Sequence, residues 1–247
     1  MPGKKNRHGL DRDIPDPIKR LVRQRCHFGC VICGRSIVEY EHFNPVFANA
    51  RTHEADGICL LCPNCHAKKT RNLLSAGRLR EAAANPICAR AGFSFDELEA
   101  QNIPPYIVFC GSLLYECETV ISVAGWPLLA VNAPEAPHAP HALSASFFNS
   151  DGRPSLLLRH NEWVVLSDQW DAELTSNTIT IRSGAGDIGL RLTFKPGAGI
   201  IVDRLNMLVA GYHFLGDAES FTVQNPLGNK TTYAQWTVPH CPVGMEL

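Results

Sequence analysis

The residues whose types and spacing could perform chemistry lie between Cys30 and His66. Two Cys-x-x-Cys pairs, Cys30/Cys33 and Cys62/Cys65, are separated by 28 residues. Each pair can form a tight turn that supplies two sulfur ligands, so this spacing predicts a structural zinc site with four cysteine ligands. A site of that kind is tetrahedral and closed, and it has no place for a further ligand.

A carboxylate and two imidazoles accompany the predicted zinc site without belonging to it. Glu41 and His42 are adjacent, and His66 directly follows the second cysteine pair. One oxygen and one nitrogen ligand suit a second, open site for Mg²⁺ or Mn²⁺. A cation held there can neutralise the charges that develop when a phosphodiester is hydrolysed. A neutral histidine beside it can serve as general base, because its unperturbed pKa lies near ~6.5.

The same residues resemble the HNH endonucleases, in the treble-clef group whose ββα-metal finger is braced by a four-cysteine zinc. The matching runs are CVICGRSIVEYEHFNP and GICLLCPNCHAKKTRNLLS, within residues 14–80. The resemblance implies that Glu41 is the first catalytic metal ligand, His42 the general base and His66 the second metal ligand. It also implies a DNA endonuclease that leaves 5′-phosphate and 3′-hydroxyl ends, in a setting such as restriction or antiphage defence.

The chain departs from the family pattern at two positions. Gly57 stands where the family usually has an asparagine, five residues before the second cysteine pair. That asparagine mainly ties down the loop that carries the base, and Asn44, Asn49 and His53 are the alternatives for replacing it. Thr70 occupies the place where some relatives have a third histidine ligand, so the resemblance implies only two protein ligands for the catalytic cation.

Basic residues around this motif are the predicted DNA contacts. Lys68, Lys69 and Arg71 follow His66 on one expected helix, where they would contact flanking phosphates without reading bases, and Arg51 is a further candidate. The alternative is a solvated helix surface. Residues 1–90 hold 16 Lys+Arg against 8 Asp+Glu, a net charge of +8, whereas residues 91–247 hold 7 against 16, a net of −9. The asymmetry predicts that only the N-terminal part meets phosphate.

The elements that must position these residues follow from local patterns. Residues 16–26 predict a helix with Ile18, Leu21, Val22 and Cys26 facing the core and a basic exterior. Strands are expected over residues 36–40 and 57–61, separated by a loop over 43–56. Helices are expected from residue 63 to about residue 74 and over residues 76–84.

Two details of this arrangement bear on the site. Neighbouring residues of a strand point to opposite faces, so Glu41 and His42 can converge only if the strand ends or bulges there, and Asn44-Pro45 favours an ending. Cys59 lies in an apolar run, and it is interpreted as a buried residue, like Cys26, instead of a zinc ligand.

Beyond Pro104-Pro105 the apolar pattern changes to a period of two with regular turn signals. The pattern predicts an all-β sandwich or small barrel, and therefore an α+β chain overall. The predicted organisation is a disordered basic tail (1–13), an HNH domain (14–90), a linker (91–105) and an all-β accessory domain (106–247). Ser94 and Glu97 form a capping-box pattern that predicts a short helix in the linker.

No run of 18 apolar residues and no signal peptide is present, so no membrane partner and a cytoplasmic location are expected. Of the ten cysteines, the six outside the two pairs lack the spacing of a disulfide framework. One ββα finger cuts one strand, so a double-strand break would need a homodimer or two nicks.

The acidic β domain is expected to bind a protein, a small molecule or another copy of the chain. Two alternatives remain open: a non-catalytic zinc-finger DNA-binding regulator whose β domain senses a ligand, and an RNA-directed nuclease or toxin.

Overall fold

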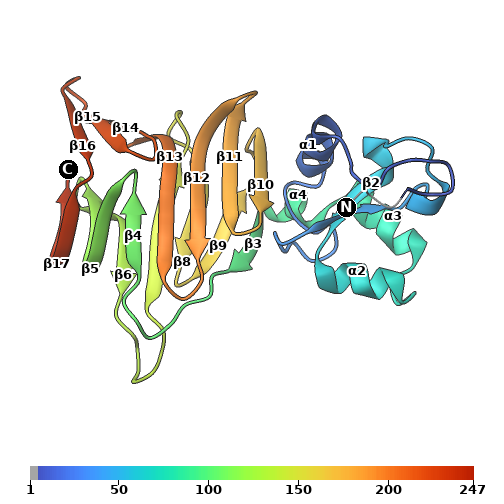
Figure 1. The fold of residues 1–247 in the computed structure, drawn as a ribbon, viewed down its shortest axis with the longest axis horizontal. Helices are drawn as coiled ribbons and strands as arrows, with labels where there is room; N and C mark the ends of the chain where they lie inside the picture. The colour runs from blue at the N-terminus through green and yellow to red at the C-terminus, as the bar shows by residue number, and fades with distance from the viewer. Residues whose placement is uncertain (1–4) are drawn as a thin grey trace. The chain divides into compact units, whose positions relative to one another are not determined.

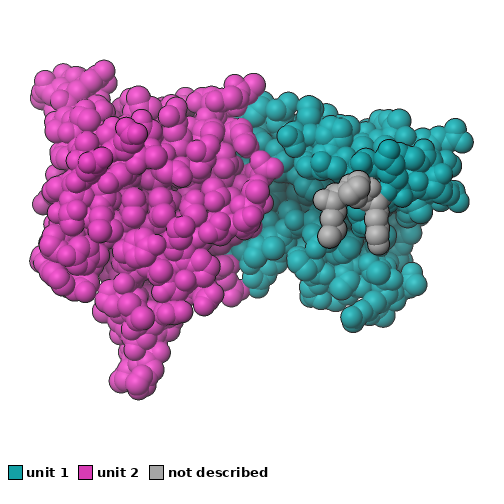
Figure 2. Space-filling model, in the orientation of Figure 1, with its two compact units in different colours: residues 1–96, 165–172 teal, residues 97–164, 173–247 magenta. Residues whose placement is uncertain are grey.

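The computed structural model describes residues 5–247, and it has an α+β fold with far more strand than helix (Figure 1). The chain divides into two compact units, coloured separately in Figure 2. Unit 1 comprises Met1–Asp96 and Val165–Ala172, and unit 2 comprises Glu97–Val164 and Glu173–Leu247. Unit 1 thus includes a short segment from within the predicted β domain. None of the helices in the described residues combines the length and the apolar character needed to cross a membrane.

Unit 1 holds all the helices and a small antiparallel sheet. Its elements, in chain order, are α1 (Asp16–Arg25), β1 (Glu39–His42), η1 (Phe47–Asn49), η2 (Ala55–Gly57), β2 (Ile58–Leu61), α2 (Pro63–Thr70), α3 (Ala76–Ala84), α4 (Ile87–Ala91) and β3 (Phe93–Glu97). Strand β1 pairs with β2 so that Glu41 lies opposite Cys59 and His42 opposite Ile58. The predicted helices at 16–26 and 76–84 are confirmed, and the helix after Pro63 ends at Thr70, earlier than expected.

The core of unit 1 lies between α1, α3 and the two-stranded sheet. Val22, Cys26 and Cys59 are completely buried, as predicted. Two expectations for α1 were wrong: Leu21 is 52% exposed, whereas Arg23, expected on the basic exterior, is 7% exposed. Arg23 can be buried because Nε and Nη2 donate to both carboxylate oxygens of Asp171, at 2.9 and 2.7 Å.

The predicted linker helix around Ser94 and Glu97 was wrong, because these residues form strand β3. The backbone N–H of Ser36 donates to the carbonyl of Phe95, and the N–H of Phe95 donates to the carbonyl of Gly34, at 2.9 and 3.1 Å. These pairings hold residues 93–97 extended and bury Ser94, which overrides the local capping pattern. They also explain why β1 starts at Glu39 instead of residue 36.

The predicted disordered tail is only partly described, since residues 1–4 lie outside the described residues. Residues 5–13 have no helix or strand, but they are held by specific hydrogen bonds. Asn6 Nδ2 donates to the carbonyl oxygens of Phe47 and Ala50, at 2.6 and 2.7 Å. The expectation of disorder was therefore wrong for this segment, which packs on the loop between β1 and β2.

Unit 2 consists of mostly antiparallel strands that follow the predicted period-two runs. The remaining strands are β4 (Tyr106–Phe109), β5 (Ser112–Val123), β6 (Trp126–Asn132), β7 (Ala142–Phe148), β8 (Pro154–Arg159), β9 (Glu162–Leu166), β10 (Asp171–Thr175), β11 (Thr178–Gly184), β12 (Asp187–Lys195), β13 (Gly199–Val209), β14 (Tyr212–Gly216), β15 (Ser220–Gln224), β16 (Lys230–Ala234) and β17 (Thr237–Glu246). Neighbouring strands follow the order β11-β12-β13-β4-β5-β6-β7-β8-β9. Parallel pairing occurs between β13 and β4 and between β5 and β17.

The sheet of unit 2 doubles back on itself, so that strands distant in its order meet. Trp163 on β9 is 2% exposed, and its ring lies 5.7 Å from that of Phe194 on β12. The N–H of Leu208 on β13 donates to the carbonyl of Asn149, which follows β7, at 3.0 Å. Trp163 is therefore a core residue of unit 2.

Candidate active site

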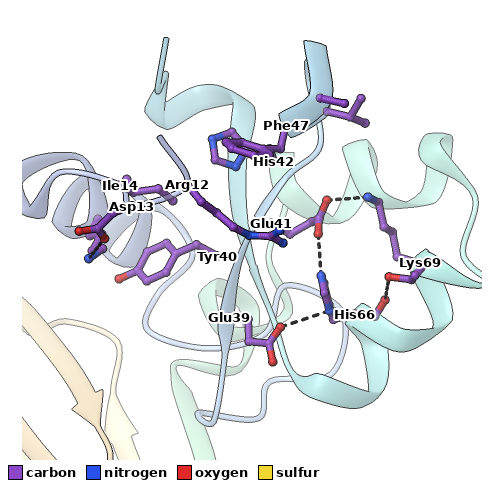
Figure 3. A pocket seen from close by; sticks show the side chains of 14 residues that line it. Arg12, Asp13, Ile14, Glu39, Tyr40, Glu41, His42, Phe47, His66 and Lys69 are labelled. Atoms are coloured by element: carbon purple, nitrogen blue, oxygen red, sulfur yellow. Dashed lines mark hydrogen bonds and ion pairs between the residues drawn. The ribbon is translucent and has the colours of Figure 1, made fainter. Parts of the chain in front are cut away.

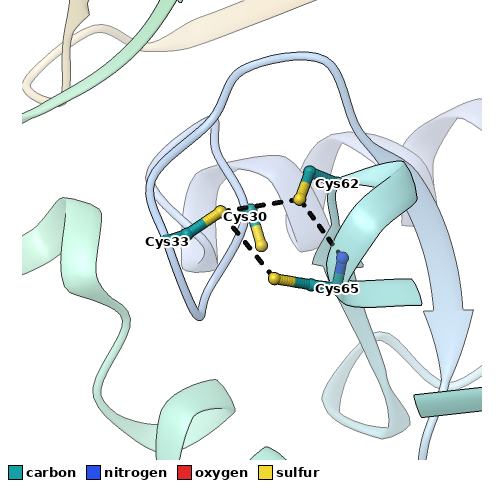
Figure 4. Close-up of side chains that lie close together, drawn as sticks. All are labelled: Cys30, Cys33, Cys62 and Cys65. Atoms are coloured by element: carbon teal, nitrogen blue, oxygen red, sulfur yellow. Dashed lines mark hydrogen bonds between the residues drawn. The ribbon is translucent and has the colours of Figure 1, made fainter. Parts of the chain in front are cut away.

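The four cysteines predicted to bind zinc converge at one point. Their sulfur atoms all lie within 4.8 Å of one another and point toward a common centre (Figure 4). Cys33 Sγ lies 3.5 Å from Cys62 Sγ and 3.8 Å from Cys65 Sγ. Zinc–sulfur bonds of about 2.3 Å in a tetrahedron place the sulfurs about 3.8 Å apart, so the observed geometry fits zinc. Within the described residues no other group of three or more potential ligands is this compact.

The protonation of the cysteine cluster is coupled among its members. A hydrogen bond from Cys33 lowers the pKa of the Cys30 thiol to about 5. The same hydrogen bond, followed by burial, raises the pKa of Cys33, and burial raises that of Cys65 to about 12. A bound Zn²⁺ would replace these shared protons, because thiolates are the ligands that the ion requires.

The second cysteine pair directly positions His66. Cys62 is the N-cap of α2, where its sulfur accepts a hydrogen bond from the N–H of Cys65 at 3.4 Å, and Pro63 occupies the first turn. His66 is in that same first turn, with its N–H bonded to the carbonyl of Cys62 at 2.8 Å. Zinc binding and the placement of His66 therefore depend on the same turn of helix.

Strand β1 brings Glu41 to His66 (Figure 3). Glu41 Oε2 lies 2.9 Å from His66 Nε2. Two adjacent ligands of an octahedral cation with bonds of about 2.1 Å are expected about 3.0 Å apart, so this pair fits the predicted Mg²⁺ or Mn²⁺ site. The Glu41 side chain is only 10% exposed, which limits its movement.

Each of the two candidate ligands has a second polar partner: Glu39 contacts His66, and Lys69 contacts Glu41. Glu39 Oε2 lies 3.2 Å from His66 Nδ1, so the carboxylate can accept the Nδ1 proton and leave the Nε2 lone pair for a cation. Lys69 Nζ lies 2.6 Å from Glu41 Oε1 and so engages the other oxygen of that carboxylate. Lys69, predicted to contact DNA, thus has a partner within the site.

His42, the predicted base, lies against His53 and Phe47. His42 Nε2 is 3.0 Å from His53 Nδ1, and the ring centroids of His42 and Phe47 are 5.3 Å apart. Burial, followed by the field of His53, holds the pKa of His42 below its ordinary value, against the opposing field of Glu41. His42 is therefore neutral at physiological pH, as a general base must be.

The structure explains the glycine at position 57. The carbonyl of Gly57 accepts the N–H groups of Phe43 and Asn44, at 2.9 and 3.2 Å. A Cβ atom on residue 57 would lie 2.1 Å from the carbonyl oxygen of Asn44, so no asparagine fits there. Backbone hydrogen bonds therefore tie down this loop. Strand β1 includes both Glu41 and His42, which pair in regular register with Cys59 and Ile58, and it ends only after His42, so the expected end or bulge does not separate the two residues.

Glu41, His42 and His66 line a single cavity of about 720 Å³. Figure 3 shows Glu41 pointing toward His66 and Lys69, and His42 pointing toward Phe47. Other predicted contacts lie outside this cavity: Lys68, Arg71 and Arg51 are exposed and do not line it. The lining residues that sequence reasoning missed are, besides Glu39, chiefly Arg12, Lys19, Tyr40 and Phe47.

Comparison of this chain with protein-family models, with curated proteins and with solved structures finds no match.

Proposed function

We propose that unit 1 is a metal-dependent endonuclease of the HNH type that hydrolyses DNA phosphodiester bonds. The observation that carries the proposal is the 2.9 Å separation of Glu41 Oε2 and His66 Nε2 in a cavity that His42 also lines. The compact cysteine cluster supports the proposal, because its last member, Cys65, directly precedes His66. The excess of basic residues in 1–90 supports a polyanionic substrate.

Each side chain has a distinct role in the proposed reaction. Glu41 and His66 would hold the cation, which when bound neutralises charge on the scissile phosphate and the leaving 3′ oxygen. His42 accepts a proton from the attacking water at Nδ1, the nitrogen that does not contact His53. Glu39 fixes the His66 ring, and Lys69 restrains the Glu41 carboxylate. The products would carry 5′-phosphate and 3′-hydroxyl ends.

One observation favours the alternative of a non-catalytic zinc-finger DNA-binding protein. Glu41 already contacts Lys69 and His66, so its charge can be balanced without a second cation. In that case the cluster is a structural ion network that braces α2 against β1. The alternative predicts DNA binding without cleavage, and a site that takes up no cation beyond zinc.

The test compares the wild-type protein with the His42→Ala variant at matched zinc content. Supercoiled plasmid is incubated with Mg²⁺ or Mn²⁺, and RNA of similar length is added as competitor. We expect nicking by the wild type alone, because the variant retains both metal sites but has no base. Equal nicking by the variant would reject this mechanism, and preferential loss of the RNA would indicate an RNA-directed nuclease.

For unit 2 we propose a targeting or sensing role. Residues 106–247 hold 7 basic and 13 acidic residues, a net charge of −6, so a DNA surface is disfavoured there. A protein, a small molecule or a second copy of the chain is the expected partner. Pull-down and sedimentation measurements on the full chain, with and without DNA, separate these partners.

A further inference from the structure

The segment before α1 is anchored at both ends. At its start, the Asn6 side chain donates to the carbonyls of Phe47 and Ala50, while Asn6 Oδ1 accepts the N–H groups of His8 and Leu10 at 2.9 and 3.0 Å. At its end, Ile14 is buried in the core of unit 1 with 5% exposure. Residues 6–14, hereafter the N-terminal arm, therefore follow a defined path beside the loop that carries Phe47.

The arm brings Arg12 to the cavity that contains Glu41 and His42. Arg12 lines this cavity, and its guanidinium carbon lies 5.6 Å from the centroid of the Phe47 ring (Figure 3).

Arg12 differs from the other two basic side chains of the cavity wall. Lys19 pairs with Asp13 at 3.2 Å, and Lys69 pairs with Glu41 at 2.6 Å. Among residues 5–247, no carboxylate forms an ion pair with Arg12. A guanidinium carries five N–H donors in a planar fork that matches the oxygens of a phosphate. Arg12 is thus a cation, held over the candidate site, whose donors remain available to an anion.

We infer that Arg12 binds the non-bridging oxygens of the phosphodiester that lies between Glu41 and His42, and that Asn6 is the positioning residue of the arm that delivers it. The inference rests on the proposed function, since it assumes that this cavity receives a phosphodiester. It makes a segment outside the metal-binding motif part of the substrate site. Removal of the arm would accordingly impair substrate binding without removing any metal ligand.

The main experiment compares Arg12→Gln with Arg7→Gln, a matched loss of one charge on the same arm outside the cavity. DNA nicking is measured in Mg²⁺ at equal zinc content, and DNA affinity is measured as a function of salt. We expect Arg12→Gln to lower kcat/KM about 10- to 100-fold, whereas Arg7→Gln changes it less than about twofold. The kcat/KM of Arg12→Lys should lie between those of the wild type and Arg12→Gln, because lysine keeps the charge but not the planar set of N–H donors. The slope of log affinity against log salt should fall by about one for Arg12→Gln.

A double-mutant cycle tests the role of Asn6. Asn6→Ala should lower kcat/KM by releasing the arm, yet cause no further loss in the Arg12→Gln background, because both changes remove the same contact. Circular dichroism and zinc content verify that each variant is folded. Additive losses would refute the delivery of Arg12 by the Asn6 anchor.

The outcomes separate this inference from the proposed function. If the wild type cleaves and Arg12→Gln cleaves as fast as Arg7→Gln, the inference fails and the nuclease remains. If the zinc-loaded wild type never cleaves nucleic acid, the proposed function fails. In that case the salt slope still decides whether Arg12 contacts a phosphate, and an unchanged slope overturns the inference as well.

Discussion

The Nε2 atom of His42 lies 3.0 Å from the Nδ1 atom of His53, in a pair of rings whose centroids are 5.2 Å apart. When His42 donates its Nε2 proton to His53, the lone pair on His42 Nδ1 is free to accept a proton from water. The contact is therefore compatible with the tautomer that a general base needs. Among the three alternatives for the missing asparagine, His53 is thus the one whose side chain contacts His42.

Replacement of His53 tests whether this residue holds His42 in the tautomer protonated at Nε2. His53→Ala removes the acceptor, so we expect kcat for plasmid nicking to fall about 10- to 100-fold with little change in KM. His53→Asn should retain more activity than His53→Ala, because an amide oxygen can still accept the Nε2 proton. Equal activities of the two variants would indicate that His53 only fills space. Zinc content serves as the control for folding.

The pH dependence of cleavage should follow His42. A general base must be neutral, so the rate falls when pH drops through its pKa. Burial and His53 lower that pKa, which shifts the acid limb of the profile below the usual value near ~6.5. In His53→Asn the repulsion between two imidazoles is absent, so the limb should move to higher pH. Single-turnover rates between pH 5 and pH 8 measure the acid limb of the wild type and of His53→Asn. An acid limb at the same pH in both proteins would contradict the assignment of this pKa to His42.

Loss of one cysteine of the candidate zinc cluster should disorder helix α2. Cys62→Ser removes both a zinc ligand and the sulfur that caps α2, so we expect loss of zinc and of helical circular dichroism from unit 1. Cys59→Ala is the matched control, because Cys59 is equally buried but lies outside the cluster. It should retain one zinc and lose only about 1–2 kcal/mol of stability. A zinc-binding Cys62→Ser would show that the ligand set is wrong.

Short-range spacing predicted the cysteine cluster and three residues of the cavity, Glu41, His42 and His66, but not the other residues that line it. The cysteine pairs, the Glu41-His42 dipeptide and the histidine after Cys65 each occupy one turn or one strand, where sequence distance and spatial distance nearly agree. The expected end or bulge of the strand between Glu41 and His42 was wrong, because both residues pair in regular register with β2. The alternation of apolar residues likewise predicted most strands of unit 2, because period two follows directly from strand geometry.

Long-range contacts could not be predicted in the same way. Asn6 binds the Phe47 carbonyl across 41 residues, and Arg23 binds Asp171 across 148. Residues 93–97 carry a helix-start pattern but pair with residues 34–37, and this tertiary pairing outweighs the weak local preference. Residues 165–172 belong to unit 1, but no pattern within this segment predicts that. The partner of Asp171 is Arg23 on α1, which is distant in sequence.

The buried pair of Arg23 and Asp171 connects that captured segment to strand β1. Arg23 Nη1 also lies 2.9 Å from the hydroxyl of Tyr40, which stands between Glu39 and Glu41. Burial opposes the charge of Arg23, but the hydrogen bonds to Asp171 and Tyr40 outweigh it and raise the Arg23 pKa. The Gln24 side chain donates to the carbonyl of Trp170 at 2.6 Å, and Arg20 lies over the Trp170 ring at 5.0 Å.

Asp171→Ala should therefore destabilise unit 1, although Asp171 is distant in sequence from every site residue. The variant leaves Arg23 buried without its carboxylate, and breaking such a pair typically costs about 3–5 kcal/mol. Chemical denaturation followed by helical circular dichroism measures the loss, because the helices of the described residues all lie in unit 1. The control is Asp168→Ala, which removes an exposed carboxylate from the same segment and should change stability by less than about 0.5 kcal/mol.

Replacing both partners, in Arg23→Met/Asp171→Leu, should restore much of the lost stability, since apolar residues of similar volume remove the unpaired charge. If Asp171→Ala were as stable as Asp168→Ala, segment 165–172 would not be an integral part of unit 1.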